Sequence, residues 1–421
     1  MDKKLYKIMP ITILFLSLLV TILTVSDMGK EYFSKRELVS GIANNSKKVS
    51  SGEENYSNSL FGKLKTVENR IDSLIDTINL GYESKLRFRD EIVSVSSIID
   101  TKLFGEKEIY GYTIDNYGMI QSVKNRVDIS YCAKSTIQLS QFCNSKGITC
   151  FYIMPPCKYI RGVTILNEGI RDYSNENMDA FVEAVSNHMS VIDLREVLFD
   201  QLSAPQSCFY KGDHHWRINL AFDAFQTVSK ELIQNDDRFK YEQRSKDAGD
   251  YNSILYNNVF IGAQSKKIGS LLTGKDDFEL IYPNFETSYQ IQQKYYNQII
   301  DKREGSFLES LVYNEVFDKL PSDDCYDSYL MYGNTEKIII NNLSNNSLRL
   351  LVIGDSFSRP FTCFLADLFH ETRTIDTQYN HPNIKDYIEN YNPDYVIVML
   401  NSSALGEGYV QTFDFEGIGQ P

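Results

Sequence analysis

The sequence lacks most of the features by which small stapled proteins and nucleic-acid-binding proteins are recognised. Its 421 residues contain 43 Lys and Arg against 56 Asp and Glu, so the net charge is −13. An acidic chain has no general basic stripe for a phosphate backbone, and we expect no nucleic-acid partner. The seven cysteines are scattered without a C-x-x-C pair and therefore provide no zinc framework.

What is present is typical of a globular protein. Hydrophobic residues make up 42% of the chain and charged residues 24%, which is unlike the composition of a disordered or collagenous chain. The length is sufficient for two or three units that bury a core without disulfides. The 28 tyrosines are a usage that often accompanies polar ligand surfaces such as carbohydrate grooves.

The N-terminus carries a long apolar segment. Residues 8–25 are uncharged and almost wholly apolar, and Lys3, Lys4 and Lys7 precede them. This pattern predicts a transmembrane signal anchor over residues 1–27, with the N-terminus cytoplasmic and the main domain extracytoplasmic. A cleaved signal peptide and a buried core helix are the alternatives, but the end of the segment lacks small residues at A-x-A spacing.

Residues 28–84 are predicted to form a linker and a helical stalk. Residues 44–58 are polar and have no hydrophobic period, whereas apolar residues between 60 and 78 recur at alternating steps of four and three. Two interpretations stay open for the segment 60–78. It is either an amphipathic helix that packs on its own domain or a short coiled-coil seam that pairs with a second copy of the chain.

From residue 85 to 421 the pattern predicts an α/β domain. Short continuous apolar runs predict buried parallel strands at 148–154, 348–353 and 395–400, and amphipathic periods predict helices between them. This alternation is typical of a sheet with helices on both faces. Residues of about 240–345 lack that rhythm, and we expect an irregular insertion that contains strands.

One candidate reactive residue follows the strand at 348–353. There the chain reads Gly354, Asp355, Ser356, at the expected start of a helix. A serine in this place lies at the carboxyl end of a strand, where ligands bind in open α/β folds. Its amide and the helix N-terminus could stabilise an oxyanion, and the glycine would let a substrate approach. The alternative is a structural turn in which Asp355 or Ser356 caps the helix.

A second candidate cluster reads Asp213, His214, His215, Trp216 and precedes an amphipathic helix. Residues two apart in an extended segment point the same way, so Asp213 and His215 share a face. A carboxylate beside an imidazole fixes its tautomer and supports the imidazolium that forms when it takes a proton from serine. A metal site and a structural cap are the alternatives; we expect no metal.

Together these segments resemble the DHHW protein family and the alginate O-acetyltransferase-like proteins, whose domains are of the SGNH type. Further matching segments are 154–158, 260–262, 327–330 and 333–334. The resemblance implies a flavodoxin-like three-layer sandwich in which Ser356 is the nucleophile, His215 the base and Asp213 its orienter. The chain departs from many relatives at residues 376–379, which read Asp-Thr-Gln-Tyr where an arginine is common.

Five further residues are candidates for substrate or oxyanion contacts. Arg359 could replace the arginine that is missing from residues 376–379, and Trp216 either walls the cleft or anchors the core. The full set is Gly354, Arg359, Tyr379, Trp216 and Lys158. Each of them also has an ordinary structural interpretation.

The resemblance implies a membrane-anchored, extracytoplasmic O-acetyltransferase or acetylesterase that acts on a cell-envelope or secreted polysaccharide through a Ser-His-Asp triad. We expect no cofactor, because a partner or a small molecule would supply the acyl group. The implied partners are the polysaccharide acceptor and a multipass membrane O-acyltransferase. The alternative is a non-catalytic glycan-binding or assembly component of a polysaccharide-modifying complex.

Overall fold

The computed structural model describes most of the chain beyond the N-terminal segments. The described residues are 89–239, 248–295, 298–322, 324–331, 336–376, 383–406 and 415. The predicted anchor (1–27), the predicted linker and stalk (28–84) and the seam at 60–78 lie outside them. Among the residues that are described, no helix is both long and apolar enough to cross a bilayer.

The described residues fall into two compact units, one of residues 89–111 with 264–274 and the other of residues 112–263 with 275 onward. In the first unit, α4 (Arg89–Ile98) continues as a π-helix (Ile99–Phe104) that ends at Gly105 in the left-handed conformation. The hydrogen-bonding pattern therefore changes within one continuous helical stretch. The prediction of a single domain from residue 85 stays a prediction.

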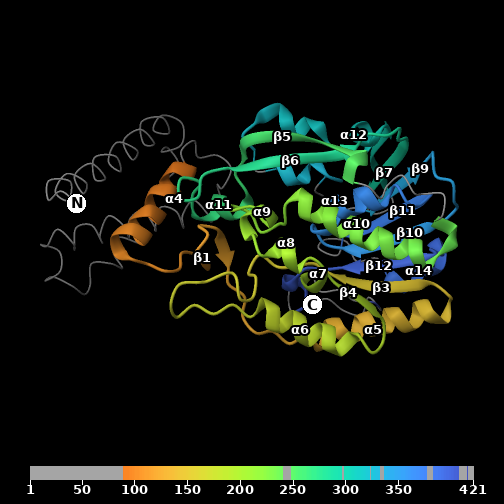
Figure 1. The fold of residues 1–421 in the computed structure, drawn as a ribbon, viewed down its shortest axis with the longest axis horizontal. Coiled ribbons are helices and arrows are strands. Elements are labelled where there is room, and N and C mark those ends of the chain that lie inside the picture. The colour runs from red at the N-terminus through yellow and green to blue at the C-terminus, as the bar shows by residue number, and fades with distance from the viewer. Residues whose placement is uncertain are drawn as a thin grey trace, which may run out of the picture. The chain divides into compact units, whose positions relative to one another are not determined.

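The second unit is built on an eight-stranded sheet. Its strand order is β4-β3-β12-β10-β11-β9-β7-β8 (Figure 1). Strands β4, β3, β12, β10 and β11 run parallel, and β9, β7 and β8 continue the sheet as antiparallel strands. The bounds are β3 (Thr149–Met154), β4 (Ser190–Asp193), β7 (Tyr289–Tyr295), β8 (Gln298–Gly305), β9 (Glu336–Asn341), β10 (Arg349–Gly354), β11 (Glu371–Asp376) and β12 (Tyr395–Met399).

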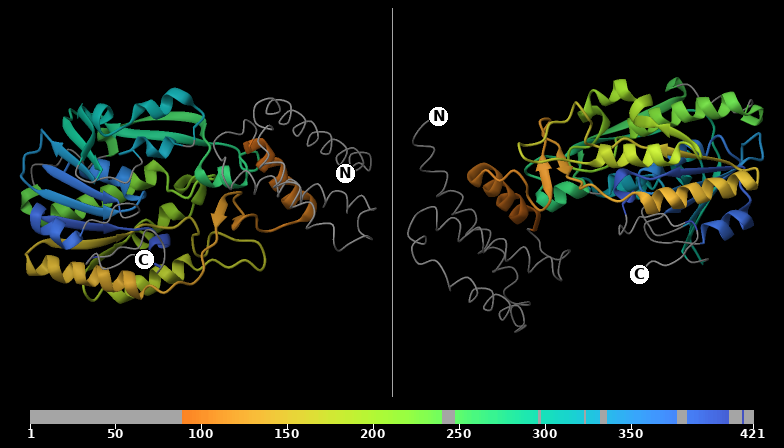
Figure 2. Two further views of the ribbon diagram at one scale, coloured as in Figure 1. Left: turned by 180° about the vertical axis from the view of Figure 1, so that it is seen from behind. Right: turned by 90° about the horizontal axis from the view of Figure 1, so that it is seen from below.

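Helices cover both faces of this sheet (Figures 1 and 2). Leu350 and Val352 of β10 enter one core, whereas Leu351 and Ile353 enter the other, because successive side chains of a strand point to opposite faces. The first core includes residues of α10 (Ile218–Asn235) and α13 (Ser358–Leu365), and the second includes residues of α5 (Ser130–Ser145), α6 (Ser174–Val185) and α14 (Ile384–Tyr391). The α/β class and its layers are confirmed.

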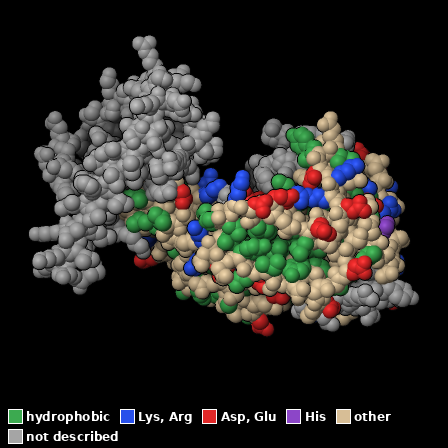
Figure 3. Space-filling view, turned by 90° about the horizontal axis from the view of Figure 1, so that it is seen from above, with side chains coloured by type: hydrophobic (Ala, Val, Ile, Leu, Met, Phe, Trp, Pro, Cys, Tyr) green, Lys and Arg blue, Asp and Glu red, His purple; other side chains and the backbone are tan. Residues whose placement is uncertain are grey.

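The insertion is more regular than the sequence suggests. Three of its strands, β7, β8 and β9, lengthen the central sheet, because β9 pairs with the edge of β11. Strands β5 (Tyr251–Phe260) and β6 (Asp276–Pro283) form a separate two-stranded ribbon. This ribbon exposes Ile254 and Leu255, and hydrophobic side chains gather on the face seen in Figure 3.

Short elements connect the larger ones. A hairpin of β1 (Tyr112–Ile114) and β2 (Ile120–Ser122) opens the second unit. The short helices are α7 (Leu194–Val197), α8 (Phe199–Leu202), α9 (Pro205–Cys208), α11 (Ala263–Ile268) and α12 (Phe307–Ser310). The 3₁₀ turns are Asp237–Phe239, Ala248–Asp250, Asn314–Lys319, Cys325–Ser328 and Ser402–Ala404.

Glycine is required where β10 passes into α13. A Cβ atom on Gly354 would lie 2.8 Å from Ser358 Cβ and 3.0 Å from the Met399 carbonyl oxygen. The missing side chain therefore lets the first turn of α13 pack against the ends of β10 and β12. This is a packing role, and it differs from the substrate approach that the sequence suggests for Gly354.

We predict that Gly354→Ala lowers the free energy of unfolding by about 1–3 kcal/mol, the usual cost of overpacking a filled site. The matched control is Gly249→Ala, because a Cβ there would meet no atom within 4 Å. Urea unfolding of both variants measures the difference. Equal stability of the two variants would contradict the packing role.

Candidate active site

Ser356 lies in a short turn between β10 and α13, and the Asp355 carboxylate holds that turn. Its Oδ1 accepts from the Phe357 amide at 2.9 Å, and its Oδ2 accepts from the Asn401 amide at 2.7 Å and from Asn401 Nδ2 at 2.6 Å. Burial raises the pKa of Asp355 to about 6. Asp355 thus fastens the turn to the segment that follows β12, whereas the N-cap of α13 is Phe357 and no side chain caps this helix.

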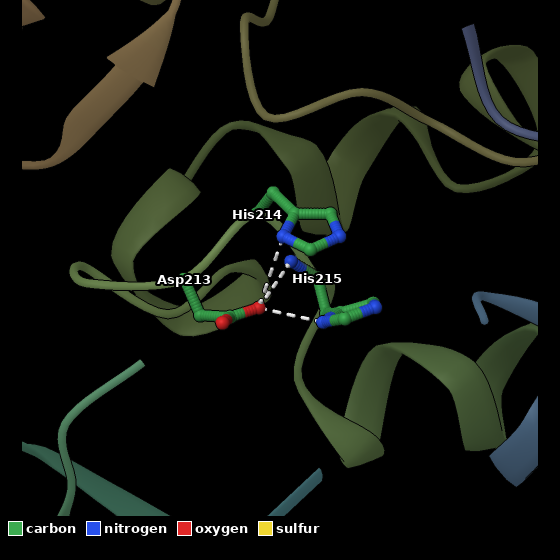
Figure 4. Close-up of side chains that lie close together, drawn as sticks. All are labelled: Asp213, His214 and His215. Carbon is green, nitrogen blue, oxygen red and sulfur yellow. Dashed lines mark hydrogen bonds and ion pairs between the residues drawn. The ribbon is translucent and has the colours of Figure 1, made fainter. Parts of the chain in front are cut away.

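Asp213 and His215 face each other as their spacing predicts (Figure 4). Asp213 Oδ1 lies 2.6 Å from His215 Nδ1 and also accepts from the His215 amide at 2.9 Å. Its Oδ2 accepts from the Ala263 amide at 2.8 Å. Burial alone would raise the pKa of Asp213, but the charges of His215 and His214 and these hydrogen bonds outweigh it and lower the pKa. The buried carboxylate is therefore ionised.

The two candidate segments meet at the other imidazole nitrogen. His215 Nε2 lies 2.7 Å from Ser356 Oγ, although the two residues are 141 positions apart in the chain. The exposed fractions of Asp213, His215 and Ser356 are 2%, 8% and 5%. A continuous path of hydrogen bonds thus runs from a carboxylate through an imidazole to a hydroxyl, the arrangement by which a base can take a proton from serine.

The same cluster also contains the donor atoms of a candidate metal site. Asp213, His214 and His215 each offer one ligand atom, and these atoms lie within 4.8 Å of one another. However, both His215 ring nitrogens and both Asp213 oxygens already have hydrogen-bond partners. Coordination would have to break these bonds, so the donor set fits proton transfer better than a metal ion.

Lys158 holds the backbone of the segment that carries Asp213. Its Nζ donates to the carbonyl oxygens of Lys211 and Asp213, each at 2.8 Å. Burial lowers the pKa of Lys158 to about 7, although nearby carboxylates, that of Asp213 first, oppose the effect. The ammonium group thus points at the backbone of the segment that carries Asp213, whereas the sequence suggests a substrate or oxyanion contact.

Arg359 is also held by the protein itself. Its Nη1 lies 2.6 Å from Asp327 Oδ1 and its Nη2 lies 3.2 Å from Asp376 Oδ2. The side chain is buried at the start of α13. These two carboxylates engage both terminal nitrogens of the guanidinium, and the oxyanion contact of Arg359 stays a prediction.

The structure describes two of the three remaining candidate residues. Trp216 is fully buried, and its Nε1 donates to Tyr326 Oη at 3.0 Å, which agrees with the interpretation as a core anchor. Gly354 makes room for Ser358, as described above. Tyr379 lies outside the described residues.

Two further residues shape this site, and the sequence-based predictions assign no role to either of them. Gly262 has φ +78°, and a Cβ there would lie 2.9 Å from Asp213 Cβ, so only glycine lets this segment bring the Ala263 amide to Asp213. Tyr326 stacks on the His215 ring at a centroid distance of 3.9 Å. Gly262 belongs to a segment that matches the family, whereas no spacing rule connects Tyr326 with His215.

Comparison with solved structures supports the fold. Bacillus cereus PatB1, solved with a sulfonyl adduct, is 21% identical and matches with a TM-score of 0.57 over 72% of this chain and 97% of its own. A DHHW family protein from Eubacterium siraeum is 16% identical, with a TM-score of 0.53 over 71% of this chain and 93% of its own. The resemblance to DHHW family proteins is thereby confirmed at the level of the fold.

A weaker match is the O-acetyltransferase domain of Pseudomonas putida AlgJ, with 12% identity and a TM-score of 0.43 over 72% of this chain and 95% of that domain. No family model and no curated protein matches the sequence.

The low pKa of Lys158 predicts a pH effect on stability. The unfolded chain keeps the ordinary value of 10.5, so between about pH 7 and 10.5 the unfolded state binds more protons than the folded state. This group therefore makes the protein more stable as the pH rises through that range. From pH 7 to 9.5 the free energy of unfolding should rise by roughly 3 kcal/mol more in the wild type than in Lys158→Met.

Urea unfolding at both pH values checks this prediction. The control is Lys146→Met, because the Lys146 side chain is about half exposed and pairs with Glu389 at the surface. It should show the same pH dependence as the wild type. The same dependence in Lys158→Met would contradict a buried lysine that loses its proton near neutral pH.

Proposed function

We propose that this chain is a serine-dependent O-acyltransferase, or an esterase of the same chemistry, that acts on acyl groups of a cell-envelope or secreted polysaccharide. Ser356 is the nucleophile, His215 the general base and Asp213 the residue that orients it. The observation that carries the proposal is the path from Asp213 Oδ1 through His215 to Ser356 Oγ, with distances of 2.6 and 2.7 Å.

The reaction begins when Ser356 Oγ attacks the acyl carbonyl carbon and His215 Nε2 takes the hydroxyl proton. The ionised Asp213 stabilises the imidazolium that forms. Collapse of the tetrahedral intermediate breaks the bond to the leaving group, which takes the proton from His215 and leaves an acyl-serine. The Ser356 amide is the proposed oxyanion donor, and the positive end of the α13 dipole adds to the stabilisation.

The second half repeats these steps with a new acceptor. A sugar hydroxyl, or water, attacks the acyl-serine while His215 takes its proton, and the same proton returns to Ser356 Oγ when the acyl product leaves. Transfer and hydrolysis therefore use the same three side chains. The polysaccharide acceptor and a membrane O-acyltransferase as acyl source are part of the proposal and rest on the resemblance of the sequence to acetyltransferase-like proteins.

The decisive substitution is Ser356→Ala. We expect turnover of 4-nitrophenyl acetate to fall by about 10⁴-fold or more, because no other group replaces the nucleophile. Ser253→Ala is the control, since Ser253 is exposed on β5. Unchanged turnover in Ser356→Ala would rule out the proposed nucleophile. Polysaccharide binding without any ester turnover by the wild type would instead favour the glycan-binding alternative.

We also propose that residues 1–27 anchor the protein in the membrane with the main domain outside the cytoplasm. The apolar run 8–25 after three lysines is the support for this location. After lysis, the full chain should sediment with membranes, resist an alkaline carbonate wash and dissolve in detergent, whereas a variant without residues 1–27 should not sediment. Release of a chain truncated near residue 27 would show a cleaved signal peptide instead.

A further inference from the structure

The His215 imidazole lies between two other rings, of which Tyr326 is stacked on it and His214 is tilted. The Tyr326 ring centroid lies 3.9 Å from the His215 centroid, with an interplanar angle of 10°. The His214 centroid lies 3.8 Å from it at 36°. One face of an imidazole has room for only one ring at such a distance, so Tyr326 and His214 lie on opposite faces. Phe357 approaches at 5.3 Å.

Tyr326 is itself fixed in place. It lies in the buried 3₁₀ turn Cys325–Ser328, and its hydroxyl accepts from Trp216 Nε1 at 3.0 Å. Trp216 directly follows His215 in the chain and is fully buried. The Tyr326 ring is thus bonded to Trp216, the residue after His215. The turn that carries Tyr326 and the segment that carries His215 therefore pack together.

The two hydrogen bonds of His215 leave one motion unrestrained. They join Nδ1 to Asp213 and Nε2 to Ser356, and the imidazole could still rock about the line between these two nitrogens. A ring against each face blocks that rocking. The electron-rich face of a tyrosine also attracts a cation that lies over it, so Tyr326 favours the imidazolium over the neutral imidazole.

We infer that Tyr326 is a positioning residue of the reaction: its ring face holds His215 in line with Asp213 and Ser356 and stabilises the imidazolium. The inference rests on the proposed function for the reaction that His215 performs. The contacts themselves come only from the geometry of the described residues.

Several charged or titratable groups face His215 besides Tyr326. They are Asp213, His214, Asp327 and Asp355, all of which interact electrostatically with this histidine. None of them is changed by a substitution at position 326. A difference in pH dependence between variants at this position therefore measures the effect of the Tyr326 ring on His215.

The test measures how fast phenylmethylsulfonyl fluoride labels Ser356 as a function of pH, with the adduct mapped by mass spectrometry. This reagent reacts with a serine that a base has activated, and it needs no knowledge of the acceptor sugar. In Tyr326→Leu the face is lost, so the imidazolium is less stable and the midpoint of the pH–rate profile should move down by about 0.5 to 1 pH unit. The alkaline plateau should fall about tenfold.

Two further variants distinguish the effect of the aromatic ring face from the effect of lost packing. Tyr326→Phe keeps the face and loses only the Trp216 hydrogen bond, so its midpoint should stay within about 0.3 pH unit of the wild type. Tyr329→Leu is the matched control, since Tyr329 is equally buried and bonds to Ile281. Tyr329→Leu should be less stable than the wild type, and its pH–rate midpoint should not shift.

A second series covers the case in which Tyr326→Leu does not fold. Phenylalanines with increasing fluorine content at position 326 should then lower the midpoint stepwise.

The outcomes distinguish this inference from the proposed function. Labelled Ser356 with an unshifted midpoint in Tyr326→Leu, or across the fluorinated series, would overturn the role of Tyr326 and leave the acyl chemistry intact. Labelled Ser356 and a shifted midpoint without any acyl turnover would overturn the function and leave the role of the ring intact. A wild type in which Ser356 is not labelled would contradict both.

Discussion

The site depends on a buried, ionised carboxylate. Asp213 is almost completely removed from solvent, and an unpaired charge there would be costly. Three donors satisfy it, namely the His215 ring, the His215 amide and the Ala263 amide. Removal of one partner would leave the charge uncompensated, which explains why so much of the surrounding chain is arranged around this one group.

Each neighbouring segment contributes to that arrangement. Gly262 brings the Ala263 amide close because it carries no side chain, and Lys158 holds the carbonyl oxygens on either side of Gly212. The fixed carboxylate in turn fixes one nitrogen of His215, and the other nitrogen then points at Ser356. The rigidity of the base is thus a property of the backbone around Asp213 as much as of the three side chains themselves.

The central sheet places Ser356 beside His215, which is 141 positions away in the chain. Strand β10 lies between β12 and β11, so its carboxyl end is held from both sides. Asp355 ties the turn after β10 to Asn401, and Gly354 lets α13 begin at once. These contacts leave the serine little freedom to move away from His215.

The sequence predicts the parts of this fold whose signals are local. Continuous apolar runs at β3, β10 and β12 indicate buried parallel strands, and the spacing of Asp213 and His215 indicates one shared face. The directions of long side chains are not local. Lys158 and Arg359 could each point toward a substrate or into the protein, and only the packed structure shows that they meet carbonyl oxygens and carboxylates.

Pairings between distant segments are equally hidden from the sequence. Residues of the insertion alternate in burial along β7, but nothing in the sequence says that β9 and β7 extend the sheet beyond β11. The stacking of Tyr326 on His215 joins residues 111 positions apart (326 − 215) through a turn that has no periodic pattern.

The most direct test of the central claim is to trap the acyl-enzyme. The protein would be mixed with 4-nitrophenyl acetate, quenched in acid within the first turnover and digested for mass spectrometry. The account predicts one acetyl group on Ser356 in the wild type and none at that position in His215→Ala. Acetylation of another residue, or equal acetylation of Ser356 without His215, would contradict a serine that is activated by the Asp213–His215 pair.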